Sequence, residues 1–302
     1  MNTLAPIAMF AFRRPDHFER ALRALAACPE AKASALTIYC DGPRHEGDAA
    51  PVRAVRAIAR RSTGFLSVNV VEERLNRGLA ASIIHGVGEQ LSGSERVIVV
   101  EDDLVVSPHF LRYMNDGLAL YADVPKVASI HGYTYSTGAA LPETYFLRGA
   151  DCWGWATWRR AWSLFRNDGA ALLAELRGRR LTTRFDLDGS FAFTRMLEDQ
   201  ITGRNDSWAI RWHASCFLAE RLTLYPGRSL VHNIGNDASG THATRTAMFG
   251  DEVAVEPVQV LPQPPMESEA ARATIVRYLR ACRPSAPRRL GAWLRRRLGA
   301  AA

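Results

Sequence analysis

Residues 97–104 read Val-Ile-Val-Val-Glu-Asp-Asp-Leu, so four aliphatic side chains are followed directly by three carboxylates. The apolar run predicts a buried strand at 96–100. Adjacent carboxylates at the end of such a strand repel one another unless a cation or hydrogen bonds compensate. A hard divalent cation that bridges a carboxylate to a diphosphate would do so. The alternatives are a set of acids that caps the helix starting near Pro108, or a solvated turn. We name Glu101, Asp102 and Asp103 the acidic motif and treat them as candidate ligand-binding residues.

The chain before the acidic motif alternates predicted strands with predicted helices. The strands are 5–12, 35–40 and 66–71, and the helices are 16–25 (capped by Asp16), 50–61 and 79–90. This alternation predicts an α/β fold whose mostly parallel sheet is covered by helices on both faces. Ligands of such sheets bind at the carboxyl ends of the strands, and Asp41 and the acidic motif both lie at such ends.

The chain after the acidic motif has a less regular pattern. The predicted helices are 108–121, 189–202 and 207–220, and the predicted strands are 126–130 and 222–225. Loops are predicted at 133–150 and 232–249, and a linker at 257–265. The stretches 267–282 and 287–299 are basic and amphipathic.

Composition limits the class of protein. The formal net charge is +7, and much of it comes from arginines crowded after residue 276. This distribution gives little support for nucleic-acid binding. Five widely spaced cysteines without a Cys-x-x-Cys pair argue against a disulfide framework and a zinc knuckle. The sequence has no apolar run of about 18 residues and no signal-peptide order of charges, so a cytoplasmic protein is expected.

The segment Val99–Tyr113 resembles the Glu-Asp-Asp region of N-acetylglucosaminyltransferase I, an inverting glycosyltransferase of the GT-A class. The chain also resembles bacterial family-2-like sugar transferases through its tryptophan-rich block, 148–158, and Asn205–Trp212. The resemblance implies a GT-A, Rossmann-like mixed sheet flanked by helices. By it, Asp103 would bind Mn²⁺ or Mg²⁺, and Glu101 and Asp102 would contact the sugar and ribose of the donor. The implied organisation is a GT-A domain over 1–250 (nucleotide-sugar half 1–105, acceptor and catalytic half 106–250) and a linker with a basic helical tail over 251–302.

Three residues near strand ends are candidate donor ligands. Arg14 follows the first strand, where GT-A enzymes hold the nucleotide base; a surface arginine before a proline turn is the alternative. Asp41 ends the second strand, where a carboxylate can accept the N3–H of uracil, which favours a UDP or dTDP donor. An Asp-Gly-Pro turn needs no such role. Arg77 precedes a helix N-terminus, which attracts phosphate, or simply marks a break in the chain.

The tryptophan-rich block predicts contacts with sugar. Aromatic faces pack on sugar C–H surfaces while neighbouring carboxylates bind hydroxyls. GT-A enzymes carry a Gly-Trp segment after the acidic motif, and the alternative is an aromatic core. The candidate site residues are Asp151, Trp153, Gly154 and Trp155. Trp158 and Trp162 have helical spacing and are predicted core residues.

An inverting transfer needs a base for the acceptor hydroxyl, and a carboxylate serves this role. Asp206, in Asn-Asp-Ser-Trp, resembles the Asp-Asp-Trp base segment of N-acetylglucosaminyltransferase I. Asp199, in Glu-Asp-Gln, resembles the Glu-Asp base motif of family-2 transferases. We prefer Asp206, because the tryptophan matches and a loop position suits catalysis. Its alternative role is the N-cap of the next helix.

Two further segments carry expectations. The stretch 232–242 resembles the loop that closes over bound donor in GT-A enzymes, so His242 or His232 would reach the metal or the diphosphate. The tail 284–302 combines leucines and a tryptophan with arginines, which suits peripheral contact with an anionic membrane, on its inner face, or a helix docked on the domain.

The sequence therefore predicts a metal-dependent inverting glycosyltransferase. It would move a sugar from a nucleotide-sugar, with UDP-sugar favoured, to a glycan or lipid-linked acceptor in surface polysaccharide synthesis. A sugar nucleotidyltransferase is the alternative among enzymes, although Arg13-Arg14-Pro15 lacks the glycines of a phosphate loop. A non-catalytic carbohydrate-binding protein with this fold is the alternative outside the enzymes.

Overall fold

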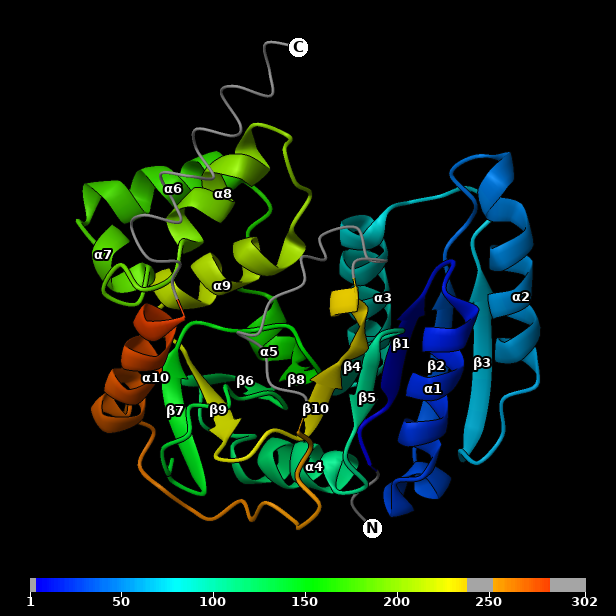
Figure 1. The fold of residues 1–302 in the computed structure, drawn as a ribbon, viewed down its shortest axis with the longest axis horizontal. Helices are drawn as coiled ribbons and strands as arrows, with labels where there is room; N and C mark the ends of the chain where they lie inside the picture. Colours follow the sequence, from blue (N-terminus) through cyan, green and yellow to red (C-terminus); the bar gives the residue numbers. More distant parts are fainter. Residues whose placement is uncertain (1–3, 238–251, 283–302) are drawn as a thin grey trace.

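The computed structural model describes residues 4–237 and 252–282 of the chain. Most strands belong to one eight-stranded sheet, in the order β3-β2-β1-β4-β8-β6-β9-β7 (Figure 1). The strands of this sheet are β1 (Ile7–Ala11), β2 (Ala35–Cys40), β3 (Ser67–Glu72), β4 (Arg96–Glu101), β6 (Val127–His131), β7 (Thr144–Arg148), β8 (Trp155–Trp158) and β9 (Leu222–Pro226). A separate two-stranded sheet pairs β5 (Leu104–Val106) with β10 (Val231–Asn233).

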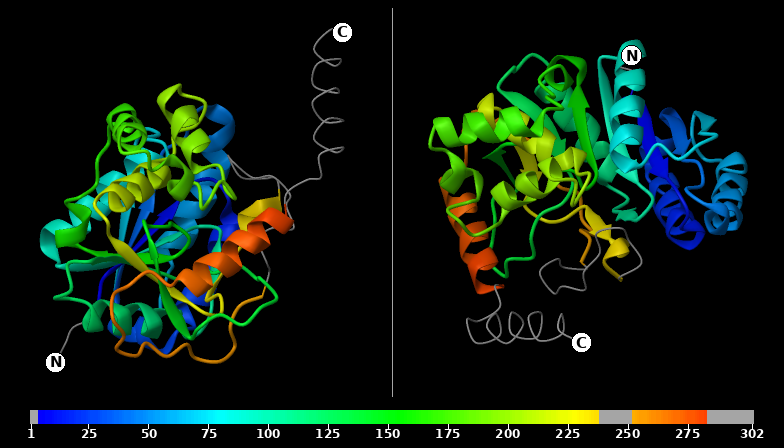
Figure 2. Two further views of the ribbon diagram at one scale, coloured as in Figure 1. Left: turned by 90° about the vertical axis from the view of Figure 1, so that its left-hand side faces the viewer. Right: turned by 90° about the horizontal axis from the view of Figure 1, so that it is seen from above.

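Helices cover both faces of this mixed sheet. The α-helices described are α1 (Pro15–Ala26), α2 (Ala49–Arg60), α3 (Leu79–Gly93), α4 (Phe110–Leu120), α5 (Arg159–Trp162), α6 (Gly169–Gly178), α7 (Thr182–Phe185), α8 (Phe193–Ile201), α9 (Trp208–Leu218) and α10 (Glu269–Ala281). The 3-10 helices are η1 (Pro29–Ala33), η2 (Glu46–Asp48) and η3 (Ile234–Asp237). Seen from above, α3 lies on one side of the first strands and α1 and α2 lie on the other (Figure 2).

The first half of the sheet confirms the predicted α/β fold. β1 pairs in parallel with β2 and β4, and β2 pairs in parallel with β3. Every residue of β1 is buried, which explains why its sequence is a continuous apolar run without alternation. The chain builds β1, β2 and β3 outward and then returns through α3 to β4, on the other side of β1. This reversal is a topological switch point, where doubly wound sheets bind ligands.

The cap predicted for the first helix is wrong. Helix α1 begins at Pro15, its N-cap residue is Arg14, and no side chain caps it. Proline at the first helical position supplies the start, because its φ is already helical and it has no N–H that needs a partner. Asp16 lies within the first turn instead.

The second half contains elements that the sequence did not indicate. The predicted loop at 133–150 is wrong at its end, because Thr144–Arg148 forms β7 and pairs antiparallel with β9. The tryptophan-rich block forms β8, which lies antiparallel between β4 and β6. The predicted loop at 232–249 begins with β10 and η3. The predictions of helices near α4, α8 and α9 and of strands near β6 and β9 are confirmed.

Helix α10 covers the β7 edge of the sheet (Figures 1 and 2). Its side chains Ala271, Ile275 and Leu279 form one buried cluster with Tyr145 of β7 and Tyr225 of β9. The chain before α10 also contacts the β7 backbone, where the Ser268 N–H donates to the carbonyl oxygen of Phe146 over 2.8 Å. The basic stretch predicted at 287–299 lies outside the described residues. No helix of the described residues is long and apolar enough to cross a membrane.

Candidate functional site

The acidic motif lies at the switch point, beside the end of β1. The Arg14 guanidinium donates from Nη2 to Asp102 Oδ1, at 2.5 Å, and to Asp103 Oδ2, at 2.9 Å. The backbone N–H of Phe12 donates to Asp102 Oδ2 over 3.2 Å. These contacts tie the carboxyl ends of β1 and β4 together. The structure thus places Arg14 and the acidic motif in one ionic cluster.

The cluster holds more negative charge than its arginine balances. Burial, then the charges of Asp103 and Asp102, raise the pKa of Glu101 to about 8, while Arg14 acts in the opposite direction. Burial likewise raises the pKa of Asp102, against the attraction of Arg14. Nη1 of Arg14 is buried without a hydrogen-bond partner among the described residues. A buried donor without a partner in the protein can donate to a ligand atom that accepts a hydrogen bond.

The segment after β10 lies directly against the acidic motif. Asn233 pairs with Leu104 in the small sheet, and the backbone N–H of Ile234 donates to the carbonyl oxygen of Asp103 over 2.9 Å. A Cβ atom on Gly235 would lie 2.2 Å from Asp103 Oδ2 and 2.9 Å from Arg14 Nη1. A side chain there would collide with the carboxylate, so glycine is what lets the backbone of this segment approach Asp103 and Arg14 closely. His242 lies outside the described residues.

The donor set can be compared with the predicted Mn²⁺ or Mg²⁺. Among the described residues, no group of three or more His, Cys, Asp or Glu side chains is arranged to hold a metal ion. Mg²⁺ is usually bound by one or two carboxylates together with phosphate oxygens and water, so a complete protein cage is not required. The half-buried Asp103 carboxylate fits that mode of binding.

Asp41 is engaged by the loop before α3. Its Oδ1 accepts from the backbone N–H groups of Gly42 and Arg77, both at 2.8 Å. Its Oδ2 accepts from Asn76 Nδ2 at 2.8 Å and from the Gly78 N–H at 3.1 Å. A carboxylate has about four acceptor positions, so this one is satisfied within the protein. The arrangement supports the turn role that was the alternative for Asp41. The exposed Arg77 pairs with Glu73 at 2.8 Å.

The tryptophan-rich block divides into core and rim. Trp155 is fully buried and its ring lies 5.3 Å from that of Trp208, so in this conformation it packs in the core. Trp158 is buried too, as predicted. Trp153 is half-buried, with its ring 4.8 Å from Tyr133. Gly154 has φ of +61°, and a Cβ there would lie 2.8 Å from Val231, which precedes the segment against the acidic motif.

Residues 151–154 lie near the acidic motif. Burial, followed by the negative charges of Asp151, Glu101 and Asp103, raises the pKa of the Cys152 thiol well above its ordinary value. The backbone of Trp155 pairs with Val99, two residues before Glu101. The Asp151 side chain is 36% exposed, so it can be reached from solvent. The strand β8, which sequence reasoning did not anticipate, brings this segment to the switch point.

Of the two predicted bases, Asp199 lies on α8 and Asp206 lies in the loop between α8 and α9. The Asp206 side chain is 70% exposed and lies 3.4 Å from Arg211 Nη2. Ser207, not Asp206, caps α9, because its hydroxyl accepts from the Ile210 N–H. Asp199 pairs with Arg204 at 2.6 Å and with Arg195 at 3.2 Å.

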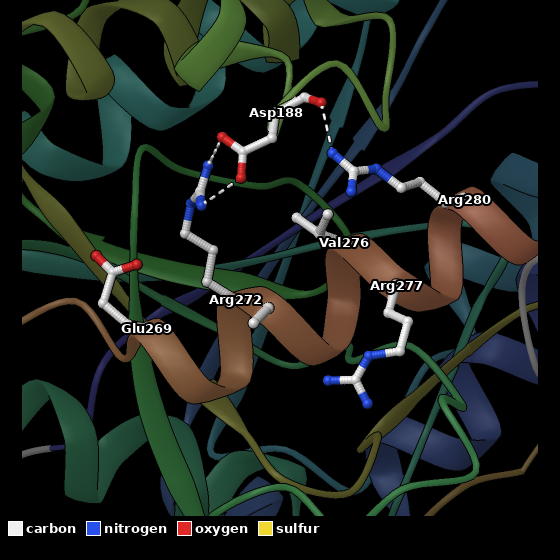
Figure 3. Close-up of a pocket in the computed structure, with 7 residues that line it drawn as sticks. Asp188, Glu269, Arg272, Val276, Arg277 and Arg280 are labelled. Atoms are coloured by element: carbon white, nitrogen blue, oxygen red, sulfur yellow. Dashed lines mark hydrogen bonds and ion pairs between the residues drawn. The ribbon is translucent and has the colours of Figure 1, made fainter.

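A separate pocket of about 330 Å³ lies along α10. Arg272 makes two hydrogen bonds to the Asp188 carboxylate, and Arg280 donates to the Asp188 carbonyl oxygen (Figure 3). Arg277 points away from Asp188 in this view. These contacts fasten α10 to the turn before α8.

Comparisons with known proteins give only remote likenesses. No protein-family model and no curated protein matches the chain. It is similar to a mannosyltransferase from Pyrobaculum calidifontis in complex with GDP-Man and Mn²⁺, at 18% identity and a TM-score of 0.32, over 44% of this chain and 36% of that one. It is similar to S. aureus TarS at 14% identity and a TM-score of 0.31, over 46% of this chain and 24% of that one. A Bacillus anthracis protein described as a glucose-1-phosphate thymidylyltransferase has 11% identity and a TM-score of 0.33, over 53% of this chain and 74% of that one. Scores this low do not place the chain in a family.

Proposed function

We propose that this chain is a glycosyltransferase that binds a nucleotide-sugar donor at the switch point between β1 and β4. One observation carries the proposal. The acidic motif and the unpartnered Nη1 of Arg14 meet at the carboxyl ends of two adjacent parallel strands, and Gly235 lies directly against them. A site with carboxylates and an arginine donor suits a ligand that carries both hydroxyls and phosphates.

Each residue of the cluster has a proposed role. Asp102, held by Phe12 N–H and Arg14, is positioned to accept hydrogen bonds from ribose hydroxyls. Glu101 would form hydrogen bonds with hydroxyl groups of the sugar. Arg14 would turn its free Nη1 to a diphosphate oxygen, because guanidinium groups bind phosphate through paired N–H donors. A UDP-sugar is the favoured donor, and a glycan or a lipid-linked glycan the favoured acceptor.

A divalent cation, Mn²⁺ or Mg²⁺, would bind at Asp103. When bound, it would supply positive charge that stabilises the leaving nucleoside diphosphate. The residues of the chain hold and orient the donor around it. Gly235 lies directly against the Asp103 carboxylate, and the η3 segment is fixed over the motif by the hydrogen bond from Ile234 to Asp103. Inversion at the anomeric carbon and a role in surface polysaccharide synthesis are part of the same proposal.

Calorimetric titration of UDP, with and without Mn²⁺, tests the donor site. We expect binding that strengthens with Mn²⁺ in the wild type and is lost in Asp103→Ala. Asp116→Asn, at a half-exposed aspartate on α4, is the matched control and should bind as the wild type does. If neither UDP, GDP nor dTDP binds the wild type under either condition, the proposal is wrong. A panel of UDP-sugars, with product NMR to read the anomeric configuration, then tests transfer and inversion.

A further inference from the structure

We propose that Asp151 is the base that takes the proton of the acceptor hydroxyl, and that the buried His131 is the positioning residue behind it. This inference rests on the proposed glycosyl transfer and adds to it. His131 ends β6, and Asp151 lies in the segment between β7 and β8. His131 Nε2 lies 3.8 Å from Asp151 Oδ2.

His131 is the unusual member of the pair. Its side chain is fully buried, and neither ring nitrogen has a hydrogen-bond partner among the described residues. Its ring packs against Tyr225, with centroids 5.0 Å apart, and against Tyr133, at 6.4 Å. Leaving a buried polar group without a partner destabilises a fold, so such a group in a folded protein calls for a functional explanation. Asp151 is the carboxylate that its Nε2 faces.

Asp151 lies beside the buried His131 and is itself partly exposed to solvent. Its Oδ1 accepts from the backbone N–H of Cys152 over 2.9 Å, which fixes one end of the carboxylate. Its Oδ2 faces His131, and the side chain is 36% exposed. Among the described residues, no arginine or lysine pairs with Asp151. An unpaired, partly exposed carboxylate keeps lone pairs that a bound hydroxyl can reach.

The pair lies close to the donor cluster. His131 and Val99 flank Trp155 in the paired rows of β6, β8 and β4. Adjacent strands are about 4.8 Å apart, so the His131 and Val99 backbones are separated by roughly 10 Å, and Val99 is two residues from Glu101. Besides burial, the charges of both Glu101 and Asp103 raise the pKa of Cys152, the neighbour of Asp151. An acceptor at Asp151 would therefore adjoin a sugar held at the acidic motif.

The proposed step balances as follows. The acceptor oxygen forms a bond to the anomeric carbon of the donor sugar, and its proton moves to the Asp151 carboxylate. The bond from the anomeric carbon to the diphosphate oxygen breaks, and its electron pair leaves with the nucleoside diphosphate. Burial lowers the pKa of His131, so the ring is neutral near pH 7 and can donate Nε2–H to Asp151. At 3.8 Å that contact is long, and catalytic hydrogen bonds often tighten only when substrate binds.

The two bases predicted from sequence have different surroundings. Asp199 is held in ion pairs with Arg195 and Arg204. Asp206 is 70% exposed and lies beside Arg211. Neither is backed by a buried group without a partner, as Asp151 is. We therefore assign proton removal to Asp151 ahead of Asp206.

The test measures nucleoside diphosphate released by the full-length protein. The donors are UDP-glucose, UDP-galactose, UDP-N-acetylglucosamine, dTDP-glucose and GDP-mannose, each with Mn²⁺ and a set of methyl glycosides as acceptors. We expect Asp151→Asn to bind nucleotide as the wild type does in calorimetry, while release falls by about 10²–10⁴-fold, the usual contribution of a general base. Asp116→Asn should retain wild-type release.

His131 has its own readout. His131→Leu should lower kcat and leave the KM for donor unchanged, while His131→Gln, whose amide can donate near the position of Nε2, should restore much of the rate. A purely structural histidine would not show this rescue. Several outcomes would overturn the inference: wild-type release in Asp151→Asn, loss of release in Asp206→Asn but not in Asp151→Asn, or a wild type that binds nucleotide and releases none. A wild type that binds no nucleotide refutes the proposed function as well, so the two failures are distinguishable.

Discussion

Gly235 lies so close to Asp103 that a residue with a side chain would not fit there. Gly235→Ala would place a Cβ 2.2 Å from Asp103 Oδ2, so the carboxylate or the η3 segment must shift. We expect UDP affinity in the presence of Mn²⁺ to fall by about tenfold or more, equivalent to about 1.4 kcal/mol. Calorimetry measures it. Gly88→Ala is the control, since nothing lies within 4 Å of a Cβ there. Equal losses in both variants would contradict the role given to Gly235.

Glu101 should make the stability of the metal-free protein depend on pH. Its pKa is raised to about 8 by burial and by its acidic neighbours, against about 4.3 for an exposed glutamate. Between these values the folded protein holds a proton that the unfolded chain has lost, so the free energy of unfolding falls as pH rises. One proton gives a slope of at most about 1.4 kcal/mol per pH unit. Urea denaturation from about pH 5 to pH 8 measures it.

The matched variants isolate Glu101 from the other carboxylates. Glu101→Gln is neutral at every pH and should flatten this slope. Glu95→Gln, at a side chain that is 76% exposed, should leave it unchanged. A slope that survives unchanged in Glu101→Gln would show that it comes from groups other than Glu101, and would contradict this prediction.

At the scale of elements, helix α10 should depend on one ion pair. The Arg272 side chain is 9% exposed, and Asp188 supplies both of its short contacts, at 2.6 and 2.8 Å. Asp188 has φ of +54°, a conformation that asparagine also tolerates, so Asp188→Asn removes the charge with little change to the backbone. We expect a loss of about 1–3 kcal/mol in urea denaturation, because a buried guanidinium loses its counter-ion. Arg277→Ala, which points away from Asp188, should stay within about 0.5 kcal/mol of the wild type, and an equal loss there would contradict this role.

Elements formed by local periodicity were predictable, and those formed by distant pairing were not. Strands β1, β2 and β4 are apolar runs between turn signals, and their local sequence suffices to predict them. Strand β7 is a run of five residues inside a Gly-, Thr- and Pro-rich stretch, and its pairing partner β9 lies far along the chain. The same holds for β10, which pairs with β5 and whose formation no local pattern indicates.

In the candidate site too, some residues could be predicted from local sequence and others could not. Arg14 and the acidic motif follow predicted parallel strands, so their meeting at one edge could be expected from the alternation of elements. Gly235 and His131 could not be assigned in this way. Gly235 lies beside Asp103 because of where β10 inserts, and His131 lies beside Asp151 because of where β8 inserts. Packing across the whole chain decides both positions. Asp41 looked like a ligand because it ends a strand, but the loop before α3 occupies its acceptor positions.

At the scale of the whole molecule, the proposed donor site joins segments from both halves of the chain. Residues after β1 and β4 meet the segment after β10 at Asp103, whereas α6, α8 and α9 share a separate buried cluster. Nucleotide that binds only the folded state adds stability by mass action, about 2.7 kcal/mol at a hundred times the dissociation constant. In hydrogen exchange, we expect UDP with Mn²⁺ to slow exchange at residues 12–14, 101–106 and 231–235 together. Exchange in α6 and α8 should change far less.

The difference in exchange protection between segments distinguishes a bridging ligand from general stabilisation of the fold. Global stabilisation alone slows exchange only at amides that open by complete unfolding, while a ligand that bridges segments also suppresses their local openings. Residues 101–106 and 231–235 share the β5–β10 ladder and the bond from Ile234 to Asp103, so they should be protected as one unit. Protection of 12–14 and 101–106 without 231–235 would mean that the nucleotide binds without engaging the segment at Gly235. In that case Gly235→Ala should bind UDP as the wild type does, and the two experiments together would confine the donor site to the first half of the chain.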